Sequence, residues 1–251
     1  MPDNLFKYTL HLADNSLIMG HRLSEWTGHG PILEQDIAIS NIALDLIGQS
    51  RNFYQYAALI KGSGTEDDLA YLRNESEFKN ILLAELPNGD WAKTILKLFF
   101  FSTYQYFLYQ ELINSFDKQL SAIAEKSLKE VTYHLRWSSE WVIRLGDGTE
   151  ESYKRMQQAL SELWVYKDEM FLSSEYEIEC AKNDIGVDVS SLKSDWENKI
   201  KEIFAEATLP SPQVEEQGVR LNGKEGRHSE QLKEILNEMQ YLQRTYPGCE
   251  W

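Results

Sequence analysis

Apolar residues recur at helical spacing along most of this chain, and short clusters of Gly and Pro separate the periodic stretches. The pattern predicts three helices in the first third of the chain, at about 5–25, 33–61 and 66–86. Further helices are predicted at about 91–116, 118–145, 149–171, 190–207 and 229–246, with a short piece near 175–183 and a loop over 210–226. Thr149 fits the N-cap position of the sixth helix. No stretch alternates with a period of two between turn signals, so we expect essentially no β-sheet.

Two of these helices show which of their faces are buried. On 118–145, apolar and small residues gather on one side: Leu120, Ile123, Ser127, Val131, Ser138, Val142 and Leu145. On 91–116, apolar and aromatic residues between Ile95 and Leu108 cover nearly the whole circumference. A helix that is apolar all round is buried on most sides. It is therefore either the central helix of a large bundle or a helix that packs against another protein, and its aromatic residues indicate packing rather than a cofactor pocket.

The lengths and order of the helices predict the fold class. Four long helices, two of them joined by a long excursion, are typical of an all-α, ferritin-like four-helix bundle. We expect a single domain over 1–251, with the bundle core at about 5–146 and accessory helices at about 149–251.

Charge and composition limit the classes of partner. The chain of 251 residues has 25 basic and 40 acidic side chains, a formal net charge of −15. Nucleic-acid binding normally requires a basic surface, and an acidic surface disfavours anionic membranes. Two cysteines do not make a disulfide framework, and the first residues lack the basic and apolar regions of a signal peptide. The most apolar run, 95–101, is too short to span a bilayer. We therefore expect a cytoplasmic protein without nucleic-acid or membrane partners.

Local motifs spread along the whole chain resemble one family. They are Tyr8-Thr9-Leu10, Ala13-Asp14-Asn15, Arg22-Leu23-Ser24-Glu25-Trp26 with Gly28-His29, Asn41-Ile42-Ala43-Leu44-Asp45-Leu46-Ile47-Gly48-Gln49, Arg51-Asn52-Phe53, Pro87-Asn88-Gly89, Lys129-Glu130, Tyr133-His134-Leu135-Arg136, Gly223-Lys224-Glu225-Gly226-Arg227-His228 and Met239-Gln240-Tyr241-Leu242-Gln243-Arg244. In this order they resemble the C subunits of bacterial phenylacetyl-CoA 1,2-epoxidases, also called phenylacetate-CoA oxygenases.

The resemblance implies a ferritin-like component of an oxygenase complex in aerobic phenylacetate degradation. It implies a homologous catalytic A subunit that holds a di-iron site, a small B subunit, and a reductase with flavin and an iron–sulfur cluster. The complex would convert phenylacetyl-CoA to its ring-1,2-epoxide with O2 and NADPH. The C subunit is regarded as structural, so no cofactor is expected in this chain. The sequence leaves open whether the isolated chain forms homodimers.

The histidine spacing bears on the metal question. A ferritin-like di-iron site uses a Glu from each of two helices and a Glu-x-x-His from each of the other two. Of the five histidines, only His228 follows a carboxylate by three residues, at Glu225, and that pair lies in the predicted loop. No predicted bundle helix carries the motif, so the sequence predicts no catalytic residue, no cofactor site and no ordinary di-iron site in this chain.

Four positions are candidate remnants of a metal site. Asp45 is followed at the expected ligand position by Gly48, which has no side chain. Glu130 precedes His134 by four residues, a spacing that can still face one metal. His134 is either a surviving ligand or a core histidine held by a neighbouring carboxylate. Asp14 in the first helix is a further candidate.

Two other polar features have a structural and a functional interpretation. Asn41, Asp45, Gln49 and Asn52 form a row that is either a solvated face, a remnant of a ligand row or a network at a contact between subunits. The basic, Gly-rich loop from Arg220 to His228 precedes a helix N-terminus. It either has a structural role, in ordering the loop or meeting an acidic partner, or forms an anion site for a ligand such as coenzyme A.

Three hypotheses about function follow. The first is a non-catalytic structural subunit of the ring-epoxidising oxygenase. The second is an autonomous ferritin-like, metal-dependent oxidase with a degenerate site around Glu130 and His134, with Asp45. The third is a helical interaction module that has no link to phenylacetate.

Overall fold

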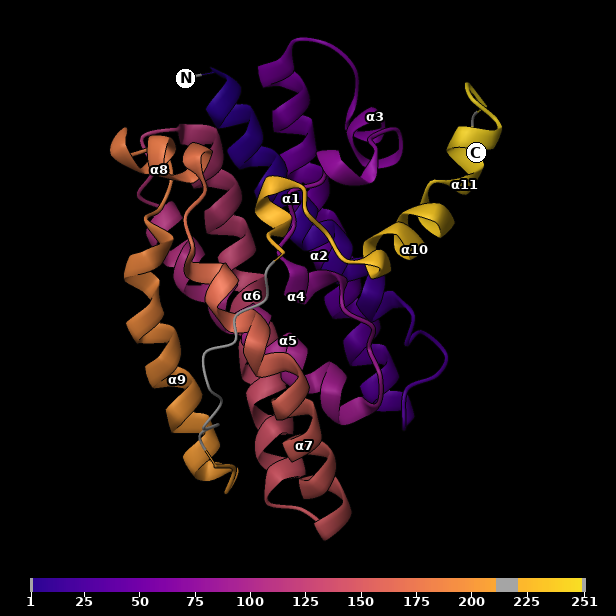
Figure 1. The fold of residues 1–251 in the computed structure, drawn as a ribbon, viewed down its shortest axis with the longest axis vertical. Coiled ribbons are helices and arrows are strands. Elements are labelled where there is room, and N and C mark those ends of the chain that lie inside the picture. Colours follow the sequence, from indigo (N-terminus) through magenta and orange to yellow (C-terminus); the bar gives the residue numbers. More distant parts are fainter. Residues whose placement is uncertain (1, 211–220, 250–251) are drawn as a thin grey trace. The chain divides into compact units, whose positions relative to one another are not determined.

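The computed structural model describes residues 2–210 and 221–249 (Figure 1). Within these ranges the regular structure is helical, and β pairing is limited to one isolated bridge between Asn222 and Arg227. The expected all-α, ferritin-like class is confirmed. None of the described helices combines the length and the apolar character needed to cross a membrane.

The chain divides into two compact units. Unit 1 comprises 1–87, 174–180 and 221–251, and unit 2 comprises 88–173 and 181–220. The single-domain organisation expected from the sequence stays a prediction. Each unit is built on one pair of long helices, so the four long helices that the sequence predicts are all present.

Unit 1 is built on α1 (Pro2–Ser24) and α2 (Leu33–Lys61), which lie side by side (Figure 1). Their close approach requires a small residue at Gly20, where an added Cβ would lie 3.2 Å from the carbonyl oxygen of Ala43. The second helix ends at the predicted residue because Gly62 adopts a left-handed conformation at φ 73°.

Unit 1 also contains several shorter helical segments. They are α3 (Glu66–Tyr71), η1 (Glu75–Glu77), α4 (Leu82–Glu85), η4 (Gly223–Glu225), α10 (Glu230–Met239), α11 (Tyr241–Thr245) and most of α8 (Glu175–Lys182). The single helix predicted over 66–86 is therefore wrong. The backbone leaves the helix after α3 because Arg73 turns inward and the backbone N–H groups of Lys79 and Ile81 bond to side chains of α1 instead.

The predicted C-terminal helix is also interrupted, between α10 and α11. The break falls at Gln240, whose side-chain amide donates to the carbonyl oxygens of Ala70 at 3.2 Å and Arg73 at 3.1 Å. Tertiary hydrogen bonds thus override the local helical pattern at this position.

Unit 2 is built on α5 (Trp91–Leu112) and α6 (Lys118–Gly146), which pack against each other. The other segments of unit 2 are α7 (Glu150–Leu163), η2 (Trp164–Phe171), η3 (Val189–Leu192) and α9 (Lys193–Glu206). Thr149 caps α7 as predicted, since its side chain accepts from the Ser152 N–H. The predicted sixth and seventh helices each include a 3-10 segment, and α5 ends at Leu112 rather than at about residue 116.

The core of unit 2 surrounds the middle of α5. Phe99, Phe100 and Phe101 are fully buried, and the indole N–H of Trp196 donates to the carbonyl oxygen of Phe100 at 3.0 Å. This confirms the prediction that α5 is buried on most sides. The all-round burial ends near Tyr106 and Phe107, which are partly exposed.

Candidate functional site

Asp14 is the candidate with the most closely defined surroundings. Its carboxylate on α1 is fully buried and accepts from the Arg73 Nη1 at 3.0 Å and the backbone N–H of Lys79 at 2.7 Å. The Tyr54 hydroxyl on α2 also donates to it, and the Arg73 Nη2 donates to both Asp14 and Tyr54. The guanidinium of Arg73 also lies over the ring of Phe78, 4.1 Å from its centroid.

This arrangement satisfies both oxygens of the Asp14 carboxylate within unit 1. Burial, followed by the charge of Asp14, raises the pKa of Tyr54 well above its ordinary value, so its hydroxyl stays protonated and donates. Burial, the largest single effect at Arg73, lowers the pKa of its guanidinium, but the charge and hydrogen bond of Asp14 together with the electrostatic effects of Tyr54 and Glu77 raise that pKa on balance. Asp14 is therefore a partner in a buried ion pair, and the Arg73 guanidinium, the Tyr54 hydroxyl and the Lys79 N–H occupy its two carboxylate oxygens.

A second buried cluster contains His11 of α1 and Glu177 of α8. Lys224 Nζ lies 3.0 Å and 3.1 Å from the two carboxylate oxygens of Glu177, and both side chains are buried. His11 Nδ1 donates to the Lys79 carbonyl oxygen at 2.7 Å, and its Nε2 accepts from the Asn15 amide at 3.2 Å.

These contacts define the protonation of His11. One ring nitrogen donates and the other accepts, as in a neutral imidazole. Burial, the largest effect, lowers the pKa of His11, which agrees with this tautomer. His11 Nε2 lies 3.6 Å from Glu177 Oε1, but a neutral His11 forms no ion pair with this carboxylate. The positive charge that balances Glu177 is on Lys224. Burial, the largest effect, would raise the pKa of Glu177, but the charge of Lys224 and the hydrogen bonds from Ser174 and Lys224 lower it on balance.

A third cluster surrounds the buried carboxylate of Glu85 at the end of α4. His228 Nδ1 lies 2.8 Å from Glu85 Oε2, and His228 Nε2 lies 3.0 Å from the carbonyl oxygen of Phe78. Both neighbours only accept, so both ring nitrogens donate and the ring is an imidazolium. Burial lowers the pKa of His228, but the hydrogen bond and charge of Glu85 outweigh it and raise the pKa on balance. Ser229 adds its N–H and hydroxyl to Glu85 Oε1 at 2.7 Å and 2.6 Å.

The basic loop before α10 therefore directs two of its cations inward. Lys224 and His228 are both buried and paired with carboxylates, so neither can meet a phosphate group. Gly223 and Gly226 lie against neighbouring backbone, since a Cβ would come within 2.1 Å of the Asn80 carbonyl oxygen and 2.2 Å of that of Ser76. These contacts favour the structural interpretation of the loop in its described part. Arg227 is exposed, and Arg220 lies outside the described residues.

The other candidate remnants lie on two different helices. Asp45 is half-buried on α2 of unit 1, whereas Glu130 is half-buried and His134 fully buried on α6 of unit 2. Over the described ranges 2–210 and 221–249, no group of three or more His, Cys, Asp or Glu side chains could hold a metal ion.

The polar row on α2 is not a uniform solvated face. Gln49 is buried, Asp45 and Asn52 are half-buried, and Asn41 is exposed. The four side chains therefore differ in burial and do not form one solvated face.

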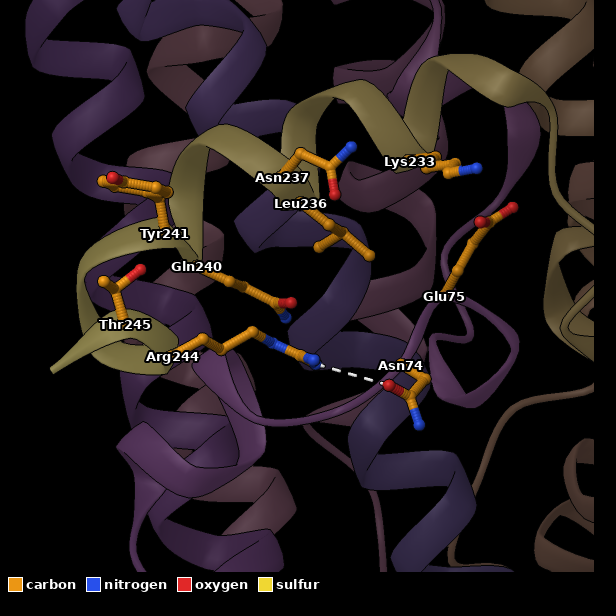
Figure 2. A pocket seen from close by; sticks show the side chains of 9 residues that line it. All are labelled: Asn74, Glu75, Lys233, Leu236, Asn237, Gln240, Tyr241, Arg244 and Thr245. Atoms are coloured by element: carbon orange, nitrogen blue, oxygen red, sulfur yellow. Dashed lines mark hydrogen bonds between the residues drawn. The ribbon is translucent and has the colours of Figure 1, made fainter. Parts of the chain in front are cut away.

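A surface pocket of about 420 Å³ lies where α10 and α11 meet the segment after α3 (Figure 2). Its lining is mixed in character: Asn74, Glu75, Lys233, Leu236, Asn237, Gln240, Tyr241, Arg244 and Thr245. Figure 2 shows Arg244 directed toward Asn74, and its guanidinium also donates to the carbonyl oxygen of Arg73 at 2.7 Å. The Arg244 side chain thus fastens α11 to the segment after α3.

Comparison with known proteins identifies the family. The family model described as phenylacetic acid catabolic protein matches residues 1–251. The chain belongs to this family. It is also 47% identical to the C subunit of the 1,2-phenylacetyl-CoA epoxidase of Escherichia coli strain K12, over 99% of this chain and 100% of that protein. The family resemblance seen in the sequence motifs is thereby confirmed.

A ferritin-like bundle can hold a di-iron site built from Glu and Glu-x-x-His ligands. The described donors do not fit one. On α1 the carboxylate of Asp14 is occupied by Arg73, and on α2 Gly48 stands where a ligand would follow Asp45. On α6 Val131 stands three residues before His134, where the motif needs a Glu. The described side chains at these three positions therefore do not make an ordinary di-iron site.

Sequence reasoning identified one member of each of the three clusters but missed a partner in each. Asp14, Lys224 and His228 were singled out, whereas Arg73, Glu177 and Glu85 were not. The flanking glycines were a usable signal that the loop around Lys224 and His228 lies close to other backbone. No local signal marks a partner that lies 59 residues away along the chain, as Arg73 does from Asp14.

Proposed function

We propose that this chain is the non-catalytic structural subunit of a multicomponent oxygenase that epoxidises the aromatic ring of phenylacetyl-CoA. Its proposed role is to support a homologous di-iron catalytic subunit in aerobic phenylacetate degradation in the cytoplasm. The observation that carries the proposal is the 47% identity to the C subunit of an epoxidase along the full length of both chains.

The buried ion pairs support the scaffold role. A carboxylate that binds a metal needs free oxygens, whereas at Asp14 a guanidinium holds both oxygens. The Glu177–Lys224 and Glu85–His228 pairs likewise join segments far apart in the sequence and use their carboxylates for structure. Side chains committed to buried pairs favour one rigid arrangement of unit 1, which suits a subunit whose task is to hold another protein.

The proposed complex contains three further components. They are the catalytic subunit, a small B-type subunit, and a reductase that passes electrons from NADPH through flavin and an iron–sulfur cluster. Iron and O2 chemistry are assigned to the catalytic subunit, and no resident cofactor is assigned to this chain.

Co-expression with the catalytic and small subunits tests the proposal. We expect the chains to co-purify, iron to remain with the catalytic subunit after the chains are separated, and phenylacetyl-CoA turnover to require both. The isolated chain, reconstituted anaerobically with ferrous iron, should hold no stoichiometric metal and show no turnover with the reductase. Two irons per isolated chain, or turnover by it alone, would overturn the non-catalytic role. Failure to co-purify would contradict the complex.

A further inference from the structure

Residues 221–249, which we call the C-terminal strap, bury little apolar surface. They contain η4, α10 and α11 and belong to unit 1. Three apolar side chains of α10 are buried, Leu232, Ile235 and Leu236, whereas no side chain of α11 is buried. A helix as short as α10, with ten residues, is marginal on its own. The strap therefore depends on its polar contacts with the rest of unit 1 to stay folded and in place.

The two ends of the strap are held by contacts that do not involve a histidine. Near its start, Lys224 Nζ lies 3.0 Å and 3.1 Å from the two carboxylate oxygens of Glu177. Near its end, the Gln240 amide and the Arg244 guanidinium donate to the carbonyl oxygen of Arg73 at 3.1 Å and 2.7 Å. Figure 2 shows both side chains extending from the strap toward the segment after α3. An amide and a guanidinium do not titrate near neutral pH, so this end of the strap stays attached.

The middle of the strap is held by one carboxylate, that of Glu85 on α4. His228 Nδ1 donates to its Oε2 at 2.8 Å, and the N–H and hydroxyl of Ser229 donate to its Oε1 at 2.7 Å and 2.6 Å. Ser229 is the residue before α10, so the carboxylate fixes the start of that helix. The side chains of His228 and Glu85 have no exposed surface, so solvent does not screen this contact.

The hydrogen bonds of His228 require its proton. Its two ring nitrogens face the Glu85 carboxylate and the Phe78 carbonyl oxygen, which only accept, and a neutral imidazole has a single N–H donor. Loss of a proton would therefore set a nitrogen lone pair against one of these oxygens. It would also leave the Glu85 charge buried without its cationic partner, which is costly in a protein interior. Deprotonation of His228 thus weakens the attachment at the middle of the strap.

We propose that His228 is a pH-dependent clasp: the C-terminal strap is closed while its ring is an imidazolium, and the part around α10 opens once the ring loses a proton. Opening would separate Ser229 from Glu85 and uncover the apolar side of α10. The ends of the strap, at Lys224 and Gln240, would stay attached. The clasp is thereby a local conformational switch within unit 1, distinct from global unfolding.

The surroundings of His228 set the pH range in which the clasp opens. Burial is the largest effect on its pKa and lowers it, but the hydrogen bond and charge of Glu85 on α4 outweigh burial. The hydrogen bond to the Phe78 carbonyl and the charge of Asp14 on α1 act in the same direction as Glu85. Because the pKa is raised on balance, the proton is lost above the ordinary value of 6.5. The clasp therefore opens on the alkaline side of pH 6.5.

The other charged groups near the clasp do not share this titration. Arg22 of α1 donates to the carbonyl oxygen of the last residue of α4 at 3.0 Å and to a carbonyl oxygen of α10 at 3.3 Å, and a guanidinium stays charged. On the strap itself, Arg227 and Glu230 are exposed. His21 of α1 faces the strap with the opposite response, since burial lowers its pKa and the charge of Glu238 on α10 offsets this only in part. His21 therefore titrates below pH 6.5, outside the range of the clasp.

Native-state hydrogen exchange of the full-length chain tests the clasp. Protection factors, which remove the intrinsic pH dependence of amide exchange, should fall at least about threefold in α10 between pH 6 and pH 8, because opening releases the proton that the closed strap holds. The same amides should respond little to low concentrations of urea, since a local opening exposes little surface. Unchanged protection in α10, or a urea dependence as steep as that of the amides in the core of α5, would overturn the proposal.

Two substitutions identify the group that titrates. His228→Asn keeps a donor near Glu85 but cannot take up a proton, so α10 should have the same low protection at pH 6 and pH 8. His21→Asn is the matched control, because this histidine faces the same helix, and it should retain the fall in protection. A fall that persisted in His228→Asn or vanished in His21→Asn would refute the clasp.

A further measurement needs no variant. The carbon-bound protons of the His228 ring, followed by NMR in the unmodified chain, should titrate above pH 6.5, in step with the loss of protection in α10. A His228 ring that titrated below pH 6.5 in the folded chain would contradict the proposal even if His228→Asn failed to fold. Circular dichroism melts at pH 6 would show which variants are folded. All of these measurements use this chain alone, so their results are independent of whether the proposed oxygenase complex forms.

Discussion

Arg73 neutralises the buried carboxylate of Asp14, with Nη1 3.0 Å from Oδ2 and a second nitrogen on the other oxygen. Removing one partner of a buried ion pair leaves an uncompensated charge and costs ~3–5 kcal/mol. Arg73→Met should therefore reduce the free energy of unfolding by about that amount, measured by urea denaturation. The substitution should also make the segment between α3 and α4 open more often, which would be measured as faster hydrogen exchange of the Lys79 amide.

The matched control is Arg155→Met on α7, which removes an arginine with two acidic partners, Glu151 and Asp90. This side chain is 53% exposed, and solvent screens an exposed ion pair, so Arg155→Met should cost far less stability than Arg73→Met. Equal losses from Arg73→Met and Arg155→Met would contradict the view that the Asp14 pair holds unit 1 together.

The imidazolium of His228 predicts a pH-dependent contribution to stability. Its folded pKa is raised above the ordinary 6.5 by the hydrogen bond and charge of Glu85, which outweigh burial. The stabilisation is therefore fully present below about pH 6.5 and is lost as the pH rises through the folded pKa. His228→Asn should destabilise the protein more at pH 6 than at pH 8, measured by urea unfolding at both values.

His11 has the opposite sign and must be separated from this effect. Burial lowers its folded pKa, so its contribution is present above pH 6.5 and is lost as the pH falls. Because His11 is unchanged in His228→Asn, its contribution cancels in the difference between variant and unmodified chain. His29→Asn, at an exposed histidine, serves as the control. A loss in His228→Asn that grew with pH would rule out the imidazolium.

The extent to which the sequence predicted this structure depends on whether local or distant interactions set each element. The bounds of α2 were predicted to the residue, since an apolar period and a left-handed Gly62 both act locally. The helix predicted over 66–86 failed because the Lys79 and Ile81 amides bond to side chains of α1, 65 and 66 residues away. Such pairs have no local signature in a single sequence.

The candidate site divides in the same way. The lack of a Glu-x-x-His motif in the bundle helices could be read from spacing alone, because both ligands would lie one turn apart. The sequence marks Asp14 as a candidate, but it does not mark the Arg73 guanidinium that pairs with the Asp14 carboxylate. A buried arginine and an exposed one look alike in sequence, so the role of Arg73 required the structure.

Gly223 and Gly48 differ in whether the structure leaves room for a larger side chain. A Cβ at Gly223 would lie 2.1 Å from the Asn80 carbonyl oxygen, so Gly223→Ala must displace backbone. We expect it to destabilise the chain by about 2–4 kcal/mol, in the range of other strained or overpacked substitutions. Gly48→Ala meets no atom and should stabilise α2 by ~0.5–1 kcal/mol. Thermal unfolding of the two variants would compare them, and a larger loss from Gly48→Ala would contradict both assignments.

A substitution of His134 tests the structural-subunit hypothesis against the hypothesis of an autonomous oxidase. Its side chain is fully buried on α6, and the hydroxyl of Ser138 donates to its backbone carbonyl at 2.8 Å. If the histidine packs in the core, His134→Ala should lower the free energy of unfolding by roughly 2–4 kcal/mol through the cavity it leaves. The iron content of the purified chain should not change. Glu130→Gln keeps the size and shape of the Glu130 side chain. It should change neither the free energy of unfolding nor the iron content much. The measurement is metal analysis beside urea denaturation. Iron bound by the unmodified chain and lost in both variants would establish a metal site at Glu130 and His134.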